Sequence, residues 1–350
     1  MLKVLLVIET LCEFRYLAPV LAQLALEHAL IIGTSARSPA LYAMQKHGIP
    51  FKVLQPKGHN LQGISLVVCG FPSKEHPLAT SIAKKTRGSK RAQTLVFFQS
   101  SILPAEKPLL QEILPDRAAF ISGEAAQQFL QKHRRLDHER LEIVGHPAYG
   151  PLEKKDRAMC KRNLGITKGE TLICYHASAE ASNSRDEYLP LIARWVEAHA
   201  GRRLVVTGEF IGQEVRDQKV QDVREFFFGE LNGAMFEPVH NSPKALDAAD
   251  IIITDAPDYA VMCSLQGTPT AFLTKRAIPD RASKILKRIK LLSIIRSRKD
   301  VSELDGMRTD TASLRAYRTS RDPHLQYLMD GKGGKRFVSF VCDAARTSRS

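Results

Sequence analysis

The feature that most constrains the fold is a short run of isoleucines that ends in a polar turn. Residues 251–253 are apolar and β-branched throughout. This composition is typical of a strand that is buried on both faces of a parallel sheet. Thr254 and Asp255 then end the run with polar side chains. In an open parallel sheet, ligands bind beyond the carboxyl ends of the strands, so this turn is a candidate binding site.

The residues after this turn predict a helix and a second strand. Asp258 can serve as the N-cap of a helix over residues 259–266. Gly267 and Pro269 are suited to end that helix, and residues 270–273 resemble the next strand. The backbone N–H groups at the start of such a helix favour anions, and Pro257 has none to donate. The turn lacks the glycines of a nucleotide-binding loop, so an ordinary strand–helix–strand unit is the alternative interpretation.

The same alternation of strand and helix patterns recurs along the chain. Further strand-like runs occupy residues 1–9, 29–35, 51–55, 64–71, 94–100, 117–121, 141–145, 170–177, 202–210 and 233–240. Helical spacing follows most of them, which indicates a parallel α/β architecture. The Gly- and Pro-rich exit near residues 145–151 predicts a domain boundary. We therefore expect two doubly wound domains, residues 1–148 and 149–328, followed by a C-terminal helix and tail, 329–350.

Composition limits the class of protein. A chain of 350 residues with 44% hydrophobic residues can bury two cores. The six cysteines are scattered without a CxxC pair, which predicts a reduced, cytoplasmic protein without structural zinc. No apolar run reaches the ~18–20 residues of a membrane span, and no secretory signal is predicted. No cluster at metal-ligand spacing is visible either, so we expect no metal and no cofactor.

The net charge of +14 implies an anionic partner. Residues 275–349 hold 19 Lys and Arg against 8 Asp and Glu. Within this stretch, residues 281–299 have nearly helical apolar spacing among basic residues, which predicts a basic amphipathic helix. An anionic membrane surface, packing on the second domain and nucleic acid are the three interpretations. Because no aromatic residues interleave the basic ones, nucleic-acid stacking is disfavoured.

Three stretches resemble a known group of enzymes. Residues 233–273, the Gly-His-Pro exit after residue 144 and the segment LMDGKGGKRFVSFV at 328–341 are similar to GT-B-fold glycosyltransferases. The resemblance is nearest to CDP-glycerol glycerophosphotransferases and non-hydrolysing UDP-N-acetylglucosamine 2-epimerases. It implies two Rossmann-like domains facing across a cleft, with the C-terminal helix crossing back to the first domain.

The resemblance also implies a donor site in the second domain. Pro238, Val239 and His240 would frame the nucleotide base, and Thr254, Asp255, Asp258 and Tyr259 would face its phosphates, ribose or sugar. A polar turn after the strand at 170–177 adds phosphate donors, with an ordinary solvated loop as the alternative. These candidates are His176, Ser178, Ser182 and Arg185. Ala256 and Pro257 stand where the phosphotransferases prefer hydroxyl residues.

Candidates for catalysis lie in the first domain. Glu9 and Glu13 are in the first strand–helix turn and are our first candidates for a catalytic base, with helix capping as the alternative. His146, beside the domain exit, is the next candidate, with a structural role as its alternative. The acceptor would lie at Gln99, Ser100 and Ser101, with capping of the strand end as the alternative. The phosphotransferases have a His-Gly pair there, so this chain departs from glycerophosphate transfer.

Together with these residues, the resemblance implies a metal-independent glycosyltransferase. It would move a sugar or polyol phosphate from a UDP- or CDP-linked donor to a glycan or lipid-linked acceptor in surface polysaccharide synthesis. It would be cytoplasmic, with peripheral attachment to the inner face of the membrane through residues 281–299. The alternatives are a UDP-sugar 2-epimerase with the same fold and a non-catalytic binding protein that uses its basic surface.

Overall fold

The computed structural model describes most of the chain, in two compact units. The described residues are 1–56, 60–73, 76–88, 93–100, 113–132, 137–148, 157–177, 184–208, 235–236, 242–274, 278, 286–289, 291–307 and 330–347. Unit 1 comprises Met1–Pro151 with Pro323–Ser350, and unit 2 comprises Leu152–Asp322. The C-terminal helix therefore belongs to unit 1.

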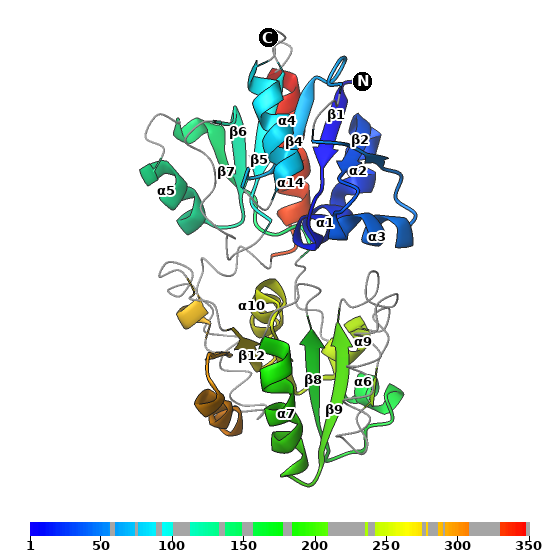
Figure 1. Ribbon diagram of the computed structural model, residues 1–350, viewed down its shortest axis with the longest axis vertical. Coiled ribbons are helices and arrows are strands. Elements are labelled where there is room, and N and C mark those ends of the chain that lie inside the picture. Colours follow the sequence, from blue (N-terminus) through cyan, green and yellow to red (C-terminus); the bar gives the residue numbers. More distant parts are fainter. Residues whose placement is uncertain are drawn as a thin grey trace. The chain divides into compact units, whose positions relative to one another are not determined.

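Unit 1 is built on a seven-stranded parallel sheet (Figure 1). Its strands are β1 (Lys3–Val7), β2 (Ala29–Thr34), β3 (Lys52–Val53), β4 (Leu66–Gly70), β5 (Thr94–Phe98), β6 (Arg117–Phe120) and β7 (Leu141–Ile143). Their order across the sheet is β3-β2-β1-β4-β5-β6-β7. The order reverses between β1 and β4, which is the topological switch point of a doubly wound fold.

Helices cover both faces of this sheet because side chains alternate along each buried strand. The helical elements are α1 (Leu11–Leu17), η1 (Ala18–Val20), α2 (Leu21–Glu27), α3 (Pro39–Lys46), α4 (Pro77–Gly88), α5 (Gly123–Lys132), η2 (His138–Arg140) and α14 (Gly333–Thr347). Phe97 belongs to the core cluster beneath α4 and α5. The next residue, Phe98, packs on the opposite face against Tyr16 of α1 and Phe337 of α14.

Unit 2 repeats the topology, with six parallel strands among its described residues. These are β8 (Thr171–Ala177), β9 (Arg202–Gly208), β10 (Met235–Phe236), β11 (Ile251–Thr254), β12 (Thr270–Leu273) and β13 (Leu292–Ile295). The order β10-β9-β8-β11-β12-β13 reverses between β8 and β11. The two sheets confirm the predicted pair of doubly wound α/β domains, and they place the switch point of unit 2 next to the isoleucine run.

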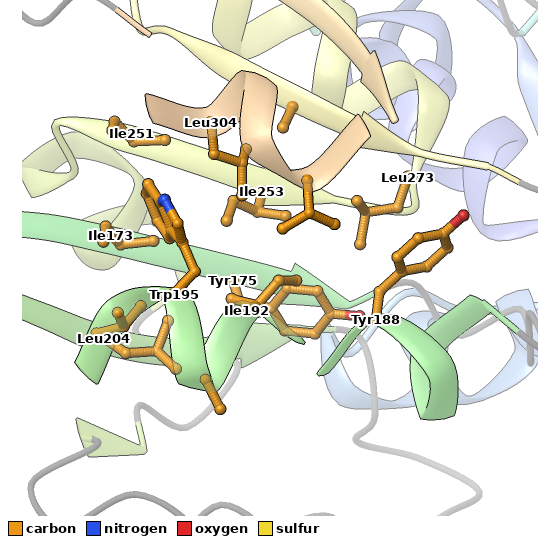
Figure 2. Close-up of a cluster of buried hydrophobic side chains, with 14 of the residues drawn as sticks. Ile173, Tyr175, Tyr188, Ile192, Trp195, Leu204, Ile251, Ile253, Leu273 and Leu304 are labelled. Atoms are coloured by element: carbon orange, nitrogen blue, oxygen red, sulfur yellow. The ribbon is translucent and has the colours of Figure 1, made fainter. Parts of the chain in front are cut away.

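The helical elements of unit 2 enclose its sheet. Among the residues that the structure describes, these elements include α6 (Arg157–Asn163), α7 (Ser184–Glu197), α9 (Ser242–Ala248), α10 (Pro257–Leu265) and η4 (Arg298–Gly306). In Figure 2, Ile173 and Ile253 of the sheet meet Ile192 and Trp195 of α7 and Leu304 of η4. Burying each large apolar side chain contributes ~1.5–3 kcal/mol, so this cluster is the main support of that face.

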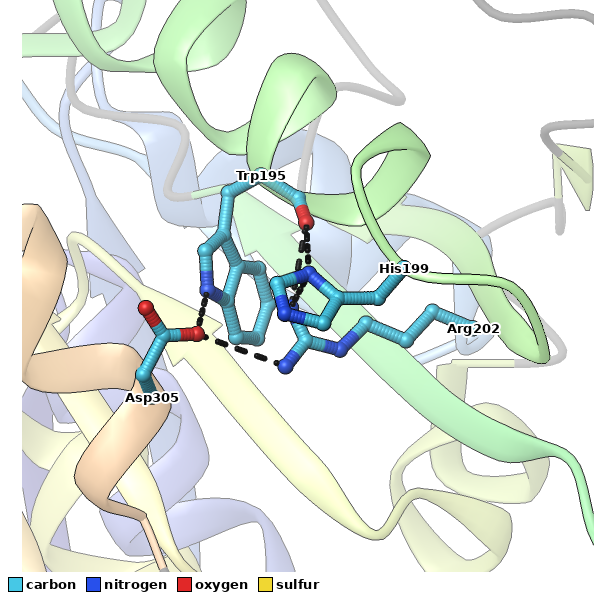
Figure 3. Close-up of polar contacts among 4 residues, drawn as sticks. All are labelled: Trp195, His199, Arg202 and Asp305. Atoms are coloured by element: carbon cyan, nitrogen blue, oxygen red, sulfur yellow. Dashed lines mark hydrogen bonds and ion pairs between the residues drawn. The ribbon is translucent and has the colours of Figure 1, made fainter.

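A polar contact fastens the edge of the same cluster (Figure 3). The indole N–H of Trp195 donates to the carboxylate of Asp305 at 2.7 Å. Arg202 stacks over the Trp195 ring at 4.0 Å and donates to its backbone carbonyl at 3.0 Å. An Arg202 N–H also donates to Nδ1 of His199 at 2.8 Å, so that ring nitrogen is an acceptor. Asp305 is half exposed, so its ion pair with Arg202 adds at most ~1 kcal/mol.

The predicted basic helix over residues 281–299 is wrong at residues 292–295, whereas residues 281–285 and 290 lie outside the described residues. Leu292–Ile295 is strand β13, which pairs in parallel with β12, and Ile295 is fully buried. Leu286 and Ile289 are also buried. The periodicity was misleading because a short buried strand and one face of a helix both supply isolated apolar residues. Within the described residues, no helix is both long and apolar enough to cross a membrane.

Candidate functional site

The strand ends at the switch point of unit 2 bring two predicted donor-site residues together. β8 and β11 are neighbours, and His176 lies directly opposite Thr254 in their register. Nδ1 of His176 is 3.3 Å from the hydroxyl oxygen of Thr254. That hydroxyl also accepts the backbone N–H of Ala256 at 3.0 Å. Both side chains are buried, so the pair has a defined geometry.

Two further predicted residues adjoin this pair. The ring of Tyr259, in the first turn of α10, lies against the ring of His176 with centroids 4.0 Å apart and planes 31° apart. Asp255 follows Thr254 and is also buried. Three elements therefore supply the four residues His176, Thr254, Asp255 and Tyr259. These residues lie together where the carboxyl ends of the central strands β8 and β11 meet. We refer to these four residues as the unit 2 edge site.

The start of α10 differs from the prediction. The helix begins at Pro257, and its N-cap is Ala256, which has no side-chain oxygen to offer the helix. Asp258 therefore lies inside the first turn and is not the N-cap. The physical reason is that the fixed φ of proline suits the first helical position, where its missing N–H costs nothing. Gly267 does end the segment, with φ of 86° in the left-handed region.

Another residue belongs beside this site but was missed from the sequence. Thr207 is fully buried near the end of β9 and lies opposite His176 in the register of β8 and β9. A threonine that closes an apolar run, as Thr254 does after the isoleucines, is the signal that could have identified it.

At the switch point of unit 1, a carboxyl group of the chain itself occupies the N-terminal end of the helix that follows β4. Glu9 follows β1, and its two oxygens accept the backbone N–H groups of Leu78 at 2.9 Å and Ala79 at 2.7 Å. These amides lie in the first turn of α4, the helix that follows β4. The Glu9 side chain is buried, and its carboxyl group occupies the N-terminal end of α4.

Glu13 caps its own helix. One of its oxygens accepts the backbone N–H groups of Glu9 at 2.6 Å and Thr10 at 3.0 Å, while the Thr10 hydroxyl accepts from the Glu13 N–H. This reciprocal pattern is a capping box. The other oxygen lies 1.9 Å from the position that a Cβ at Gly70 would take. The geometry gives both glutamates a structural role, and their roles in catalysis stay predictions.

His146 is buried at the exit from β7. Its Nδ1 accepts the backbone N–H of Ala148 at 3.2 Å, and its ring meets the ring of Tyr16 edge-on at 5.0 Å. Burial and the nearby charge of Arg15 lower the pKa of His146 to about 3, although a hydrogen bond with the backbone of Ser100 opposes this. A group with so low a pKa is a weak base at neutral pH. Its catalytic role also stays a prediction.

The DGKGGKR segment fastens α14 to the same exit. Arg336 forms a two-pronged ion pair with Asp330 at 2.6 and 2.9 Å and donates to the Val144 carbonyl at 2.8 Å. A Cβ at Gly333 would lie 2.7 Å from the carbonyl oxygen of His146. The glycine and the Asp–Arg pair of this motif therefore have a packing and hydrogen-bonding explanation within unit 1.

The predicted acceptor residues follow β5. The backbone N–H of Gln99 donates to the Ala119 carbonyl at 3.0 Å, which continues the sheet by one residue. Its side-chain oxygen is buried and accepts no hydrogen bond from the part of the chain that the structure describes. Ser100 is half-buried next to it. Their role in binding an acceptor stays a prediction.

Several other predicted residues cannot be placed. Outside the described residues lie Ser101, Ser178, Ser182, Pro238, Val239 and His240. Arg185 lies in α7 and Asp258 in α10, but only their backbones are described. Within the described ranges, no group of three or more His, Cys, Asp or Glu side chains is arranged to hold a metal ion.

Comparison with known proteins identifies the fold. No family model and no curated sequence matches this chain. Among solved structures, S. aureus MnaA in complex with UDP matches with a TM-score of 0.68 at 15% identity, over 97% of this chain and 95% of that one. The UDP-GlcNAc 2-epimerase of Neisseria meningitidis, bound to UDP-GlcNAc, has a TM-score of 0.60 at 10% identity, over 98% of this chain and 100% of that one.

A glycosyltransferase from Rickettsia africae has a TM-score of 0.58 at 11% identity, over 98% of both chains. These likenesses extend over both units, so the similarity is not confined to one Rossmann-like sheet. The chain therefore has the GT-B fold, in which two Rossmann-like domains are combined, as in known UDP-sugar epimerases and glycosyltransferases.

Proposed function

We propose that this protein is a glycosyltransferase that binds its nucleotide-sugar donor at the unit 2 edge site. The observation that carries the proposal is a difference between the two switch points. In unit 1 the helix after the fourth strand, α4, is capped by the carboxylate of Glu9. In unit 2 the equivalent helix, α10, starts at Pro257, and its N-cap residue, Ala256, supplies no side-chain hydrogen bond to the helix start.

This difference favours unit 2 as the site of the diphosphate. A helix N-terminus carries roughly half a positive charge and directs its N–H groups at a bound anion. At α4 a diphosphate would meet the negative charge of Glu9, whereas at α10 it would meet backbone N–H groups beside His176. His176, Thr254 and Tyr259 add polar and aromatic groups that could orient the phosphates and sugar.

The assignment of the donor to unit 2 leaves the acceptor to be bound by unit 1. With the donor in unit 2, the acceptor hydroxyl would be held by unit 1, at the carboxyl end of β5 near Gln99 and Ser100. We propose a glycan or lipid-linked glycan as the acceptor, in the synthesis of surface polysaccharide. We do not propose that a helix over residues 281–299 binds the membrane, because Leu292–Ile295 within that range is a strand of the sheet.

A UDP-sugar 2-epimerase is the second candidate. It is favoured by the match to the N. meningitidis 2-epimerase, which covers 98% of this chain and the whole of the other. The two functions differ in what they require. An epimerase converts a UDP-sugar by itself, whereas a transferase needs an acceptor before it releases UDP.

Binding and product analysis test both candidates. We expect calorimetry to detect UDP or CDP binding, and we expect UDP-GlcNAc alone to remain unchanged during incubation. Inversion at C2 of that sugar without added acceptor would identify the epimerase and overturn the transferase. Absence of binding by UDP, CDP and GDP alike would contradict the donor site in unit 2.

A further inference from the structure

Glu9 joins the N-terminal ends of three helices. Its side chain accepts two N–H groups of α4, and its backbone N–H donates to Glu13 in the capping box of α1. Its backbone carbonyl accepts the hydroxyl of Ser38 at 2.7 Å, and the same hydroxyl caps α3 by accepting the N–H of Ala40 at 3.0 Å. The contact to α4 is the only one of the three that depends on the ionised state of Glu9 itself.

We propose that Glu9 is a pH-sensitive clamp: its ionised carboxylate fastens the start of α4 to the turn between β1 and α1, and protonation loosens that end of α4 while unit 1 stays folded. This inference concerns unit 1 and does not depend on the proposed function.

The chemistry of the carboxyl group explains the loosening. An ionised carboxylate has an acceptor oxygen for each of the N–H groups of Leu78 and Ala79. After protonation, one oxygen carries a hydrogen and meets an N–H donor, so one of the two hydrogen bonds is weakened or lost. The bond that remains also loses the strength that a charged acceptor supplies.

Groups on each neighbouring element affect this titration. Burial raises the pKa of Glu9 most strongly, and the charge of Glu13 on α1 raises it further. The two α4 hydrogen bonds and the charge of His76, which precedes α4, lower it. Cys69 at the end of β4 remains a neutral thiol, because burial and the two glutamates hold its pKa far above its usual range. The net result is a raised pKa for Glu9, so protonation begins at a higher pH than for an exposed glutamate.

The raised pKa has opposite local and global consequences. Because folded Glu9 holds a proton more tightly than unfolded Glu9, its contribution to global stability is fully present below the unfolded pKa and is lost as pH rises through the folded pKa. Acidification through this group therefore does not unfold the protein. Protonation of Glu9 weakens the hydrogen bonds at the start of α4, but it also removes the free-energy cost of keeping a charge buried.

Amide hydrogen exchange, measured residue by residue with NMR, tests the clamp. We expect the protection factors of Leu78 and Ala79 to fall about tenfold as the pH is lowered through the folded pKa of Glu9, which corresponds to weakened charged hydrogen bonds. The amide of Ala83, deeper in α4, should keep its protection. A ¹³C titration of the Glu9 carboxyl in the unmodified protein should follow the same midpoint.

Two variants sharpen the test. Glu9→Gln keeps the shape but not the charge, so we expect low protection at Leu78 and Ala79 at every pH, without a step. Glu27→Gln, on the exposed surface of α2, should keep the step. A flat profile in the unmodified protein, or the same step in Glu9→Gln, would overturn the proposal. If Glu9→Gln does not fold, the carboxyl and amide titrations of the unmodified protein still decide it, because a mismatch in midpoint contradicts the clamp.

Discussion

The imidazole of His176 and the hydroxyl of Thr254 end neighbouring strands and lie 3.3 Å apart, in the unit whose switch-point helix has an alanine, Ala256, as its N-cap residue. The same hydroxyl accepts the N–H of Ala256 at 3.0 Å. Thr254 therefore connects β8, β11 and the start of α10. A change at this one oxygen should disturb the imidazole and the helix start together.

Replacing that oxygen should weaken nucleotide binding. Thr254→Val keeps the shape of the side chain but removes both hydrogen bonds, each worth ~1 kcal/mol. We expect the Kd for UDP to rise at least tenfold in calorimetry. Thr34→Val is the matched control, because Thr34 also ends a strand, is fully buried, and its hydroxyl has no hydrogen-bond partner among the described residues. Equal Kd values for both variants would refute the role of Thr254.

The fit between Gly70 and Glu13 predicts a coupled pair of variants. Gly70→Ala should destabilise unit 1 by about 1–3 kcal/mol, because the new methyl would overlap the Glu13 carboxylate and force it from the capping box. In a Glu13→Ala background the same change should cost much less. Urea unfolding of the four proteins measures this coupling. Gly88→Ala, where a Cβ would meet no atom within 4 Å, is the control. Additive costs would exclude the overlap.

Two adjacent glycines of the DGKGGKR segment should respond differently. Gly333→Ala would place a methyl 2.7 Å from the backbone carbonyl of His146, and backbone cannot move aside cheaply. We expect a loss of about 1–3 kcal/mol in the free energy of unfolding. Gly334→Ala would approach the side chain of Val20 at 3.2 Å, which can adjust, and the carbonyl oxygen of Pro147 at 4.0 Å, which is an ordinary contact. Thermal unfolding of the two variants should therefore give a clearly lower Tm for Gly333→Ala, and the reverse order would contradict this packing.

His146 should make the protein less stable in acid. Its pKa of about 3 in the folded state lies below the unfolded value of 6.5, so the unfolded chain binds its proton first. The stability is fully present above pH 6.5 and is lost as pH falls toward 3, at up to ~1.4 kcal/mol for each pH unit. His146→Gln should flatten this part of the pH–stability curve, measured by urea unfolding. His138→Gln, at an exposed position, should leave the slope unchanged.

The local sequence pattern predicted most strands and helices of this fold, because each buried strand has its own run of apolar residues. The isoleucine run, Gly267 and the strand Thr270–Leu273 lie where the sequence places them. The segment around β13 was predicted as a helix because its apolar residues fit both periods. Pairing with β12, which is a tertiary contact, selected the strand.

The sequence by itself determined that this chain forms two parallel α/β sheets, since strand and helix periodicities are local properties. It also indicated that Glu9 and Glu13 act near a helix start. Only the tertiary structure decided which helix each one caps: Glu13 caps its own helix, whereas Glu9 reaches α4, at Leu78 and Ala79. The reason is that strand order brings β1 beside β4, and no local pattern records that neighbour.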